Sequence, residues 1–287
     1  MNCNQCPRQC NIDRKLSIGF CTCPEDVFVA KHMLHFWEEP LICNSTNGSG
    51  AIFFSGCNLK CVYCQNYEIS NNLVGTKYSI YELANLFKKL EELGALNINL
   101  VTPTHYQDQI IEALKIYKPK IPVVWNSSGY ESVEQIKKLK NFVDIYLVDL
   151  KYMDKDLALK LSCAKDYPEI ATSAILEMRK NQPKDIIKNQ IMKKGVIIRH
   201  LVLPNNLQNT FSVLDWIKYN LGETQYISIM AQYTPCYKSI QFPEINRKLH
   251  VIEYKRVINY VNKLNFINGF CQDLVSANIS YIPDFKN

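Results

Sequence analysis

Three cysteines with the spacing C-x3-C-x2-C are the residues in this sequence best suited to chemistry. Cys57, Cys61 and Cys64 follow the apolar run 51–54, which predicts a buried strand. Three thiolates on the loop leaving a strand can hold three irons of a cubane iron–sulfur cluster, which usually has four cysteine ligands. Because the neighbouring sequence offers no fourth cysteine, one iron would stay open to another ligand. An open iron suits a catalytic cluster and not an electron carrier.

A second group of cysteines lies within the first 23 residues, with the spacing C-x2-C-x3-C-x10-C-x-C: Cys3, Cys6, Cys10, Cys21 and Cys23. Pro7 and Gly19 supply turns that can aim several sulfurs at one point. Four thiolates complete a tetrahedral zinc site or fully ligate an auxiliary iron–sulfur cluster. The sequence leaves both open, beside the simpler interpretation of free buried thiols. A segment this short buries little apolar surface, so a bound metal would stabilise it.

The overall composition is that of an ordinary globular protein. Of 287 residues, 47% are hydrophobic and 21% are charged, and the formal net charge is +6. Basic pairs such as Lys88-Lys89 and Lys137-Lys138 are expected on solvated helix faces, because no basic stripe alternates with aromatic residues as a nucleic-acid site requires. This argues against a zinc-knuckle nucleic-acid binder. The mild positive charge is compatible with an acidic electron donor such as flavodoxin or ferredoxin.

The cysteine content also indicates a compartment. Twelve cysteines in a chain with no basic–apolar–small signal pattern predict metal ligands and not disulfides. No apolar run approaches the roughly 20 residues that a membrane helix needs. We therefore expect no membrane partner, and a location in the cytoplasm of an anaerobic cell, or one that tolerates oxygen-sensitive clusters.

Strand and helix patterns alternate from residue 51 onward. The candidate strands are 51–56, 97–102, 121–127, 143–150, 196–203 and 226–231. The candidate helices are 79–92, 107–117, 132–139, 157–178, 210–219 and 253–264. Six alternating units predict a parallel sheet, either doubly wound or curved into part of a barrel. In both folds the active residues lie at the carboxyl ends of the strands.

Polar residues follow every candidate strand, which predicts one shared mouth of the sheet. In chain order they are the first cysteine group, Thr102 with Thr104 and His105, Asn126 with Ser127, Asp149 with Lys151, Arg199 with His200, and Gln232 with Tyr233. Simpler interpretations exist: Asp149 and Lys151 could form a surface ion pair worth little, and a strand histidine is often a satisfied core residue. In the linker arm 24–50, Trp37 is expected to anchor the arm. Glu38 and Glu39 could touch substrate, but the simpler interpretation, which we expect, places them on the surface.

The first cysteine group and its surroundings resemble a known family. The spacing, Tyr63 before the third cysteine, and Gln65 with Asn66 after it resemble the radical S-adenosylmethionine enzymes. Within these, the sequence is most similar to the glycyl-radical-enzyme activases, of which the pyruvate formate-lyase activating enzymes are best known. The similarity runs nearly end to end with a less characterised activase-like branch, through segments 37–40, 97–105 and 199–204.

The resemblance implies a partial (β/α)6 TIM-like barrel over 47–287, after a cysteine-rich metal-binding extension and arm over 1–46. It implies that the first cysteine group holds a catalytic [4Fe–4S] cluster whose open iron binds S-adenosylmethionine. Reductive cleavage of that molecule yields a 5′-deoxyadenosyl radical, which abstracts hydrogen from a substrate. The branch pattern also assigns the N-terminal metal ligands as Cys3, Cys6, Cys10 and Cys21, with Cys23 to spare.

The resemblance further implies where S-adenosylmethionine binds. Family members often carry Gly-Gly-Glu after the second strand, whereas residues 102–105 here read Thr-Pro-Thr-His and lack the acid. Tyr63 is expected to cover the cluster. Other positions match Asp-Thr-Asn-Gly, Asp-Leu-Lys and the stretch leading into Val-Pro-Gly. The cofactor-binding candidates are therefore Tyr63, Thr102, Thr104, Asn126, Ser127, Asp149, Lys151, Arg199 and His200.

Three functions follow from these patterns. The first is an oxidoreductase that installs a glycyl radical on a partner enzyme, as the resemblance implies. The second applies the same radical chemistry to another peptide, protein or small molecule. The third, from a different class, is an electron-transfer or structural metal protein, against which the open corner of the cysteine triplet argues.

Overall fold

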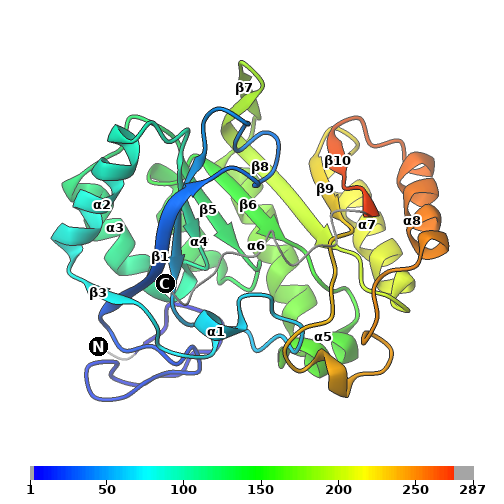
Figure 1. The fold of residues 1–287 in the computed structure, drawn as a ribbon, viewed down its shortest axis with the longest axis horizontal. Coiled ribbons are helices and arrows are strands. Elements are labelled where there is room, and N and C mark those ends of the chain that lie inside the picture. Colours follow the sequence, from blue (N-terminus) through cyan, green and yellow to red (C-terminus); the bar gives the residue numbers. More distant parts are fainter. Residues whose placement is uncertain (1–2, 275–287) are drawn as a thin grey trace.

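The structure is a computed structural model that describes residues 3–274. Its strands form one curved sheet in the order β10-β9-β8-β6-β5-β4-β2-β1-β3, with β7 paired to β8 off this path (Figure 1). The strands are β1 Val27–His35, β2 Ser49–Phe54, β3 Thr76–Tyr78, β4 Ile98–Val101, β5 Val123–Ser127, β6 Ile145–Asp149, β7 Ile186–Lys188, β8 Ile191–Leu201, β9 Tyr226–Met230 and β10 Gly269–Cys271. From β2 through β10 along this order every pair is parallel, which confirms the predicted partial barrel.

All the helices except the short α1, which follows the cysteine loop, cover the outer face of this sheet (Figure 1). They are α1 Tyr67–Ser70, α2 Ile80–Glu92, α3 Gln107–Ile116, α4 Val133–Lys138, α5 Lys155–Ser162, α6 Tyr167–Asn181, α7 Leu207–Leu221 and α8 Val251–Lys263, with short 3-10 turns at Thr104–Tyr106, Leu139–Asn141 and Ser239–Gln241. All six predicted strands are present as β2, β4, β5, β6, β8 and β9.

Two helices replace the single one predicted over 157–178. The helix α5 ends at Ser162 because Cys163 adopts the left-handed conformation, with φ 54°. The next helix, α6, begins at Tyr167 with Pro168 in its first turn, where a missing N–H costs nothing. Proline is tolerated at such a start but not inside a continuous helix, so this prediction was wrong at its centre.

The arm 24–50, expected to be a linker, instead contains the strand β1 and a plug. β1 pairs antiparallel with β2 and β3. Beyond it, Leu41 and Ile42 form the plug, which packs inside the barrel against apolar side chains near the amino ends of the strands. The Asn97 side chain donates to the Ile42 carbonyl at 2.6 Å, so the plug is tied to the amino end of β4. Trp37, expected to be the anchor, is 64% exposed, so that expectation was wrong.

Side-chain alternation along the strands produces two layers inside the barrel. Because strand side chains point alternately to the two faces, the residue two positions after an inward one also points inward. The first layer is apolar and packs on the plug: Val124, Leu147 and Ile197. The second layer, nearer the carboxyl ends, is polar: Asn126, Asp149 and Arg199. The residues between them, Trp125, Val148 and Ile198, face the helices.

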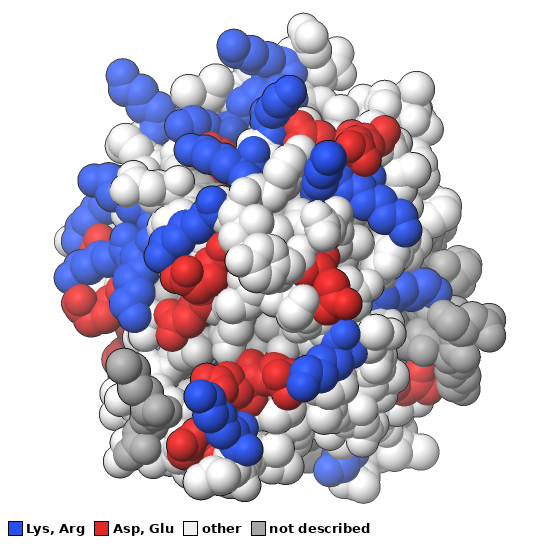
Figure 2. Space-filling view, turned by 90° about the vertical axis from the view of Figure 1, so that its left-hand side faces the viewer, with Lys and Arg blue, Asp and Glu red and all other residues white. Residues whose placement is uncertain are grey.

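The surface carries charges of both signs. Figure 2 shows acidic side chains beside basic ones on the face over α2 and α3, with the basic ones gathered toward its upper left. Lys88 pairs with Glu92 at 3.8 Å and Lys137 with Glu134 at 2.8 Å, so both predicted basic pairs lie on solvated helix faces. Within residues 3–274, no helix has the length and apolarity to cross a membrane.

Candidate active site

A cavity of about 570 Å³ runs from the cysteine loop into the polar layer of the barrel. It brings together most of the predicted site residues: Cys57, Cys61, Tyr63, Cys64, Thr102, Asn126, Ser127, Asp149, Lys151 and Arg199. The arm supplies the opposite wall with Phe36, Trp37 and Glu38. The expected single mouth at the carboxyl ends of the strands is therefore present.

The three cysteine sulfurs each have a hydrogen-bond partner. Burial raises the pKa of Cys57 to about 12 and that of Cys61 to about 11, so both are neutral thiols unless a metal replaces the proton. The partners are the Leu59 amide for Cys57 at 3.4 Å, the Ser162 hydroxyl for Cys61 at 3.0 Å and the Ser70 hydroxyl for Cys64 at 3.3 Å. These groups can stabilise bound thiolates.

Tyr63 closes one side of this loop. Its hydroxyl lies 2.5 Å from that of Tyr152, which in turn lies 2.8 Å from Ser162 Oγ. Because Ser162 donates to the Cys61 sulfur, a chain of hydroxyl groups runs from the cavity wall to one ligand atom. All these groups are excluded from solvent, so the chain fixes the orientation of the Ser162 donor.

An ionic network fills the polar layer beside the cysteines. Arg199 Nε donates to Asp149 at 2.9 Å, and Lys151 Nζ donates to the other carboxylate oxygen at 2.6 Å. Arg199 also donates to Asn126 at 2.7 Å. Burial would raise the pKa of Asp149, but the two cations outweigh it and hold that pKa below its usual value. The cavity therefore presents one ionised carboxylate and two cations on adjacent strands, and the alternative interpretation of Asp149 and Lys151 as a surface ion pair is wrong.

The arm adds two acids that were expected on the surface. Glu38 accepts from Arg199 at 3.1 Å, and from the side-chain amides of Asn99 and Asn126 at 3.1 Å each. Glu39 is buried, and burial raises its pKa to about 7. Both therefore face the barrel interior. The only sequence signal was their place in segment 37–40, which the resemblance had already singled out.

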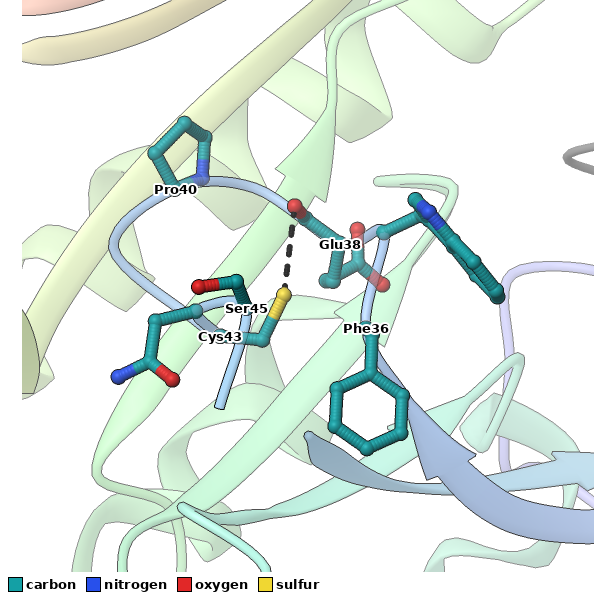
Figure 3. A pocket seen from close by; sticks show the side chains of 7 residues that line it. Phe36, Glu38, Pro40, Cys43 and Ser45 are labelled. Carbon is teal, nitrogen blue, oxygen red and sulfur yellow. Dashed lines mark hydrogen bonds between the residues drawn. The ribbon is translucent and has the colours of Figure 1, made fainter. Parts of the chain in front are cut away.

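A second hollow, of about 720 Å³, lies on the outer side of the arm and shares three lining residues with the cavity (Figure 3). They are Phe36, Trp37 and Glu38. The Cys43 thiol donates to the Glu38 carbonyl at 3.6 Å, which holds the turn of the arm closed (Figure 3). The arm is thus a thin wall between the polar cavity and the surface.

Two predicted site residues lie away from the cavity. His200 follows Arg199 and so points to the outer face, where its ring nitrogens contact the Leu150 carbonyl at 2.7 Å and Thr210 Oγ1 at 2.9 Å. Burial lowers its pKa to about 4, so it is neutral. Thr104 is buried and donates to Glu131 at 2.8 Å.

Thr102 stays at the cavity rim in a strained conformation. Its φ of 58° lies in the left-handed region, which a β-branched residue rarely adopts. Its amide donates to the Asn126 carbonyl at 2.9 Å, so the neighbouring strand holds it there. Strain of this kind persists where the surrounding structure enforces it, most often at functional sites.

Comparison with known proteins gives the family. The model of the Radical SAM superfamily matches residues 51–206, which include the cysteine triplet and the polar layer. The chain belongs to this superfamily. A relative from Methanocaldococcus jannaschii, itself uncharacterized, is 34% identical over 278 residues, covering 92% of this chain and 75% of that protein. A Haemophilus influenzae protein named as a candidate glycyl-radical enzyme activating enzyme is 24% identical, covering 67% of this chain and 68% of its own length.

Two solved structures share the fold of this chain. Streptococcus suis SuiB superposes with a TM-score of 0.53 at 15% identity, covering 78% of this chain and 49% of SuiB. The hydrogenase maturase HydG superposes with a TM-score of 0.50 at 17% identity, covering 75% of this chain and 48% of HydG. The chain thus spans about half the length of these two proteins, and the likeness extends to the fold alone.

Membership of the superfamily implies a [4Fe–4S] cluster and S-adenosylmethionine, and the cavity suits both. Three thiols on one loop, each with a hydrogen-bond partner, match the three-cysteine ligand set. The methionine part of S-adenosylmethionine carries an ammonium and a carboxylate, which need an anion and a cation close together. Asp149 and Lys151 supply that pair at the edge of the cysteine loop.

Proposed function

We propose that the chain cleaves S-adenosylmethionine reductively and transfers the resulting radical to a glycine of a partner enzyme, which makes it an oxidoreductase of the activase type. When bound, the cluster and S-adenosylmethionine supply a 5′-deoxyadenosyl radical, formed as one electron enters the sulfonium and a carbon–sulfur bond breaks. The observation that carries the proposal is that the cysteine triplet and the Asp149–Lys151–Arg199 network share one cavity.

The residues of the chain bind and orient in this mechanism. Cys57, Cys61 and Cys64 would hold three irons and leave the fourth open. Asp149 would accept a hydrogen bond from the methionine amino group, while Lys151 would pair with its carboxylate. Arg199 keeps Asp149 ionised, since its guanidinium contributes to lowering the pKa of that acid. Thr102, Asn126 and Ser127 line the rim and offer further hydrogen bonds.

Three observations favour a protein or peptide substrate. The Haemophilus influenzae relative is named for the activation of an enzyme, and one SuiB structure contains a bound precursor peptide. Phe36 and Trp37 are exposed at the edge of the cavity, where apolar surface can receive a polypeptide segment. The unpaired cysteines and the oxygen-sensitive chemistry fit a reducing, anaerobic cytoplasm, with flavodoxin or ferredoxin as donor.

The test begins with anaerobic protein reconstituted with iron and sulfide. After reduction with dithionite, addition of S-adenosylmethionine should change the EPR spectrum of the cluster and release 5′-deoxyadenosine. Cys61→Ala should abolish both effects, whereas Cys163→Ser, at an exposed cysteine, should leave both unchanged. Asp149→Asn should keep the cluster signal, but the S-adenosylmethionine concentration needed to change that signal should rise at least tenfold.

The partner is tested by mixing the active protein with glycyl radical enzymes encoded in the same genome. A glycyl-radical doublet in the EPR spectrum, dependent on S-adenosylmethionine, is the expected result. Release of 5′-deoxyadenosine driven instead by a small metabolite fraction would favour the second function, modification of a small molecule. A reduced cluster whose EPR spectrum does not change when S-adenosylmethionine is added would overturn the proposal. The protein would then be an electron-transfer protein.

A further inference from the structure

The N-terminal cysteine group lies directly against the loop that carries the catalytic triplet. The Cys21 carbonyl accepts a hydrogen bond from the Cys57 amide at 3.3 Å, so residues of the two groups are in direct backbone contact. Arg8 Nε donates to the Asn58 carbonyl at 2.9 Å, across 50 positions of sequence. The two groups of cysteines are therefore neighbours in space.

This junction is tightly packed. A Cβ atom on Gly56 would lie 2.2 Å from the Cys23 sulfur and 2.4 Å from the Cys21 carbonyl oxygen. The Cys23 thiol donates to the Ser55 carbonyl at 3.0 Å, and the buried Arg14 guanidinium donates to the Cys23 carbonyl at 3.3 Å. The spare cysteine of the N-terminal group thus packs the junction, while Cys21 forms the contact itself.

The four remaining thiols lie near one another. The would-be Cβ of Gly19 lies 3.4 Å from the Cys10 sulfur and 3.7 Å from the Cys21 sulfur. The Cys6 thiol lies within electrostatic range of the other three. Cys6 and Cys21 are buried, at 8% and 6% exposure, whereas Cys3 and Cys10 are partly exposed. The group therefore has one side toward solvent and one side toward the triplet.

The spacing of these thiols suits a cluster better than a single ion. Four thiolates on one zinc lie about 2.3 Å from it and so crowd together, but in a cubane each sulfur binds a different iron and the sulfurs lie further apart. Within residues 3–274, no three His, Cys, Asp or Glu side chains converge on a single-ion position. Gln9, Asn11 and Thr22 adopt left-handed conformations, and their amides donate to the Cys6, Cys3 and Gly19 carbonyls, so the segment is a series of tight turns that keeps the cysteines close together.

We propose that Cys3, Cys6, Cys10 and Cys21 hold a second [4Fe–4S] cluster that delivers electrons to the first. A low-potential one-electron donor of the ferredoxin type reduces it from the solvent side, at Cys3 and Cys10. The same electron leaves through Cys21 and Cys57, so the second cluster is reoxidised and the first gains one electron. That S-adenosylmethionine is the final electron acceptor rests on the proposed function, whereas the electron path between the two clusters does not.

The metal content tests the site itself. Anaerobic wild-type protein should contain about eight irons per chain and no zinc, since each cubane holds four. The triple variant Cys57→Ala, Cys61→Ala, Cys64→Ala should keep about four irons and an EPR signal, upon reduction, that ignores S-adenosylmethionine. One zinc per chain, or an iron-free triple variant beside a wild type with four irons, would overturn the proposal.

The electron path needs a kinetic test in the full-length chain. In the double variant Cys6→Ala, Cys10→Ala, reduction of the triplet cluster by reduced ferredoxin should slow at least tenfold in rapid-freeze EPR. Photoreduction with deazaflavin should still reduce the triplet cluster completely in this double variant. The control variant Cys163→Ser should be reduced by ferredoxin at the wild-type rate. Equal rates in wild type and double variant would refute the relay.

A third measurement is independent of how well the double variant folds. Fully reduced wild-type protein should show spin–spin broadening that is missing from the triple variant, because neighbouring paramagnets interact. A wild-type spectrum with no such broadening would also refute the relay. Absence of 5′-deoxyadenosine alone would count against the proposed function and leave these metal and EPR results in place.

Discussion

Glu38 and Arg199 form an ion pair inside the barrel, with 3.1 Å between Oε1 and Nη1. They lie 161 positions apart, one in the arm and the other on β8, and each side chain is only 13% exposed. Arg199 also holds Asp149, the acid next to the cysteine loop. The arm is therefore coupled electrostatically to the residues that we propose bind S-adenosylmethionine.

Neutralisation of the two acids of the arm should change the free energy of unfolding by different amounts. Glu38→Gln removes one of the two carboxylates on the buried Arg199 guanidinium, so unfolding should become easier by about 2 kcal/mol. Glu39→Gln should change the free energy of unfolding by less than about 1 kcal/mol at pH 6, because burial raises the pKa of Glu39 to about 7 and leaves it mostly protonated there. Urea unfolding of the two variants measures both.

The same two variants also test the effect of each acid on the binding of S-adenosylmethionine. The affinity for S-adenosylmethionine, read from the EPR change, should fall in Glu38→Gln. Arg199 then lacks one carboxylate partner and pairs more strongly with Asp149, which leaves that acid less available to S-adenosylmethionine. It should stay close to wild type in Glu39→Gln at pH 6. Equal loss of affinity in both variants would mean that the coupling through Arg199 is unimportant.

Gly56 should tolerate no side chain, although Gly94 has nearly the same backbone angle. Gly56→Ala would place a Cβ 2.2 Å from the Cys23 sulfur, whereas at Gly94 nothing lies within 4 Å, and φ is 82° and 83° respectively. Gly94→Ala should therefore cost only the left-handed strain of about 1 kcal/mol. Gly56→Ala should cost more than about 3 kcal/mol, or lose iron from the loop.

Iron content and urea unfolding of the two glycine variants, prepared in parallel, provide the measurement. If both alanine variants lost stability equally and kept their iron, the contact between the N-terminal group and the cysteine loop would be looser than the structure indicates.

Ser162 should tune the catalytic cluster through its bond to Cys61. The hydroxyl donates to the Cys61 sulfur at 3.0 Å, and hydrogen bonds to ligand sulfurs stabilise the reduced, more negative cluster. Ser162→Ala should therefore make the midpoint potential more negative without changing the iron content. Anaerobic EPR titration measures the potential, with Ser49→Ala as the control, because Ser49 is also buried but lies at the amino end of β2, opposite the cysteine loop. An unchanged potential in Ser162→Ala would contradict the assignment.

Glu131 should make stability fall as the pH rises. Burial raises its pKa to about 7, above the value near 4.3 of an unfolded glutamate. Its contribution is therefore fully present below about pH 4.3 and is lost as the pH rises to about 7, a loss of roughly 3 kcal/mol. Glu131→Gln should remove this loss, because an amide does not ionise while its oxygen can still accept from Trp125 and Thr104.

The measurement is urea unfolding at pH 5 and pH 7.5 for wild type, Glu131→Gln and the control Glu134→Gln. The Glu134 side chain is 78% exposed, so Glu134→Gln should change the free energy of unfolding by the same amount at pH 5 and at pH 7.5. If Glu131→Gln parallels wild type at both pH values, the buried carboxyl does not titrate as the structure implies.

Local patterns in the sequence predicted much of the fold. The six parallel strands are present because their apolar runs suit burial on both faces. The capping box of α2 is formed as its spacing predicts, with Ser79 and Glu82 bonding each other's backbone amides. Such features depend on residues a few positions apart, so a single sequence displays them. The helix predicted over 157–178 was wrong because a left-handed cysteine interrupts it.

The sequence by itself determined the chemistry of the cysteine loop and the polar residues at the strand ends. Only the tertiary structure decided that Arg199 faces the cavity while His200 faces the helices, since that depends on which face of β8 is inside. It also decided that Glu39 is buried and that Glu38 faces the barrel interior. Charged residues are normally exposed, and a carboxylate can enter a core only where distant partners such as Arg199 compensate its desolvation.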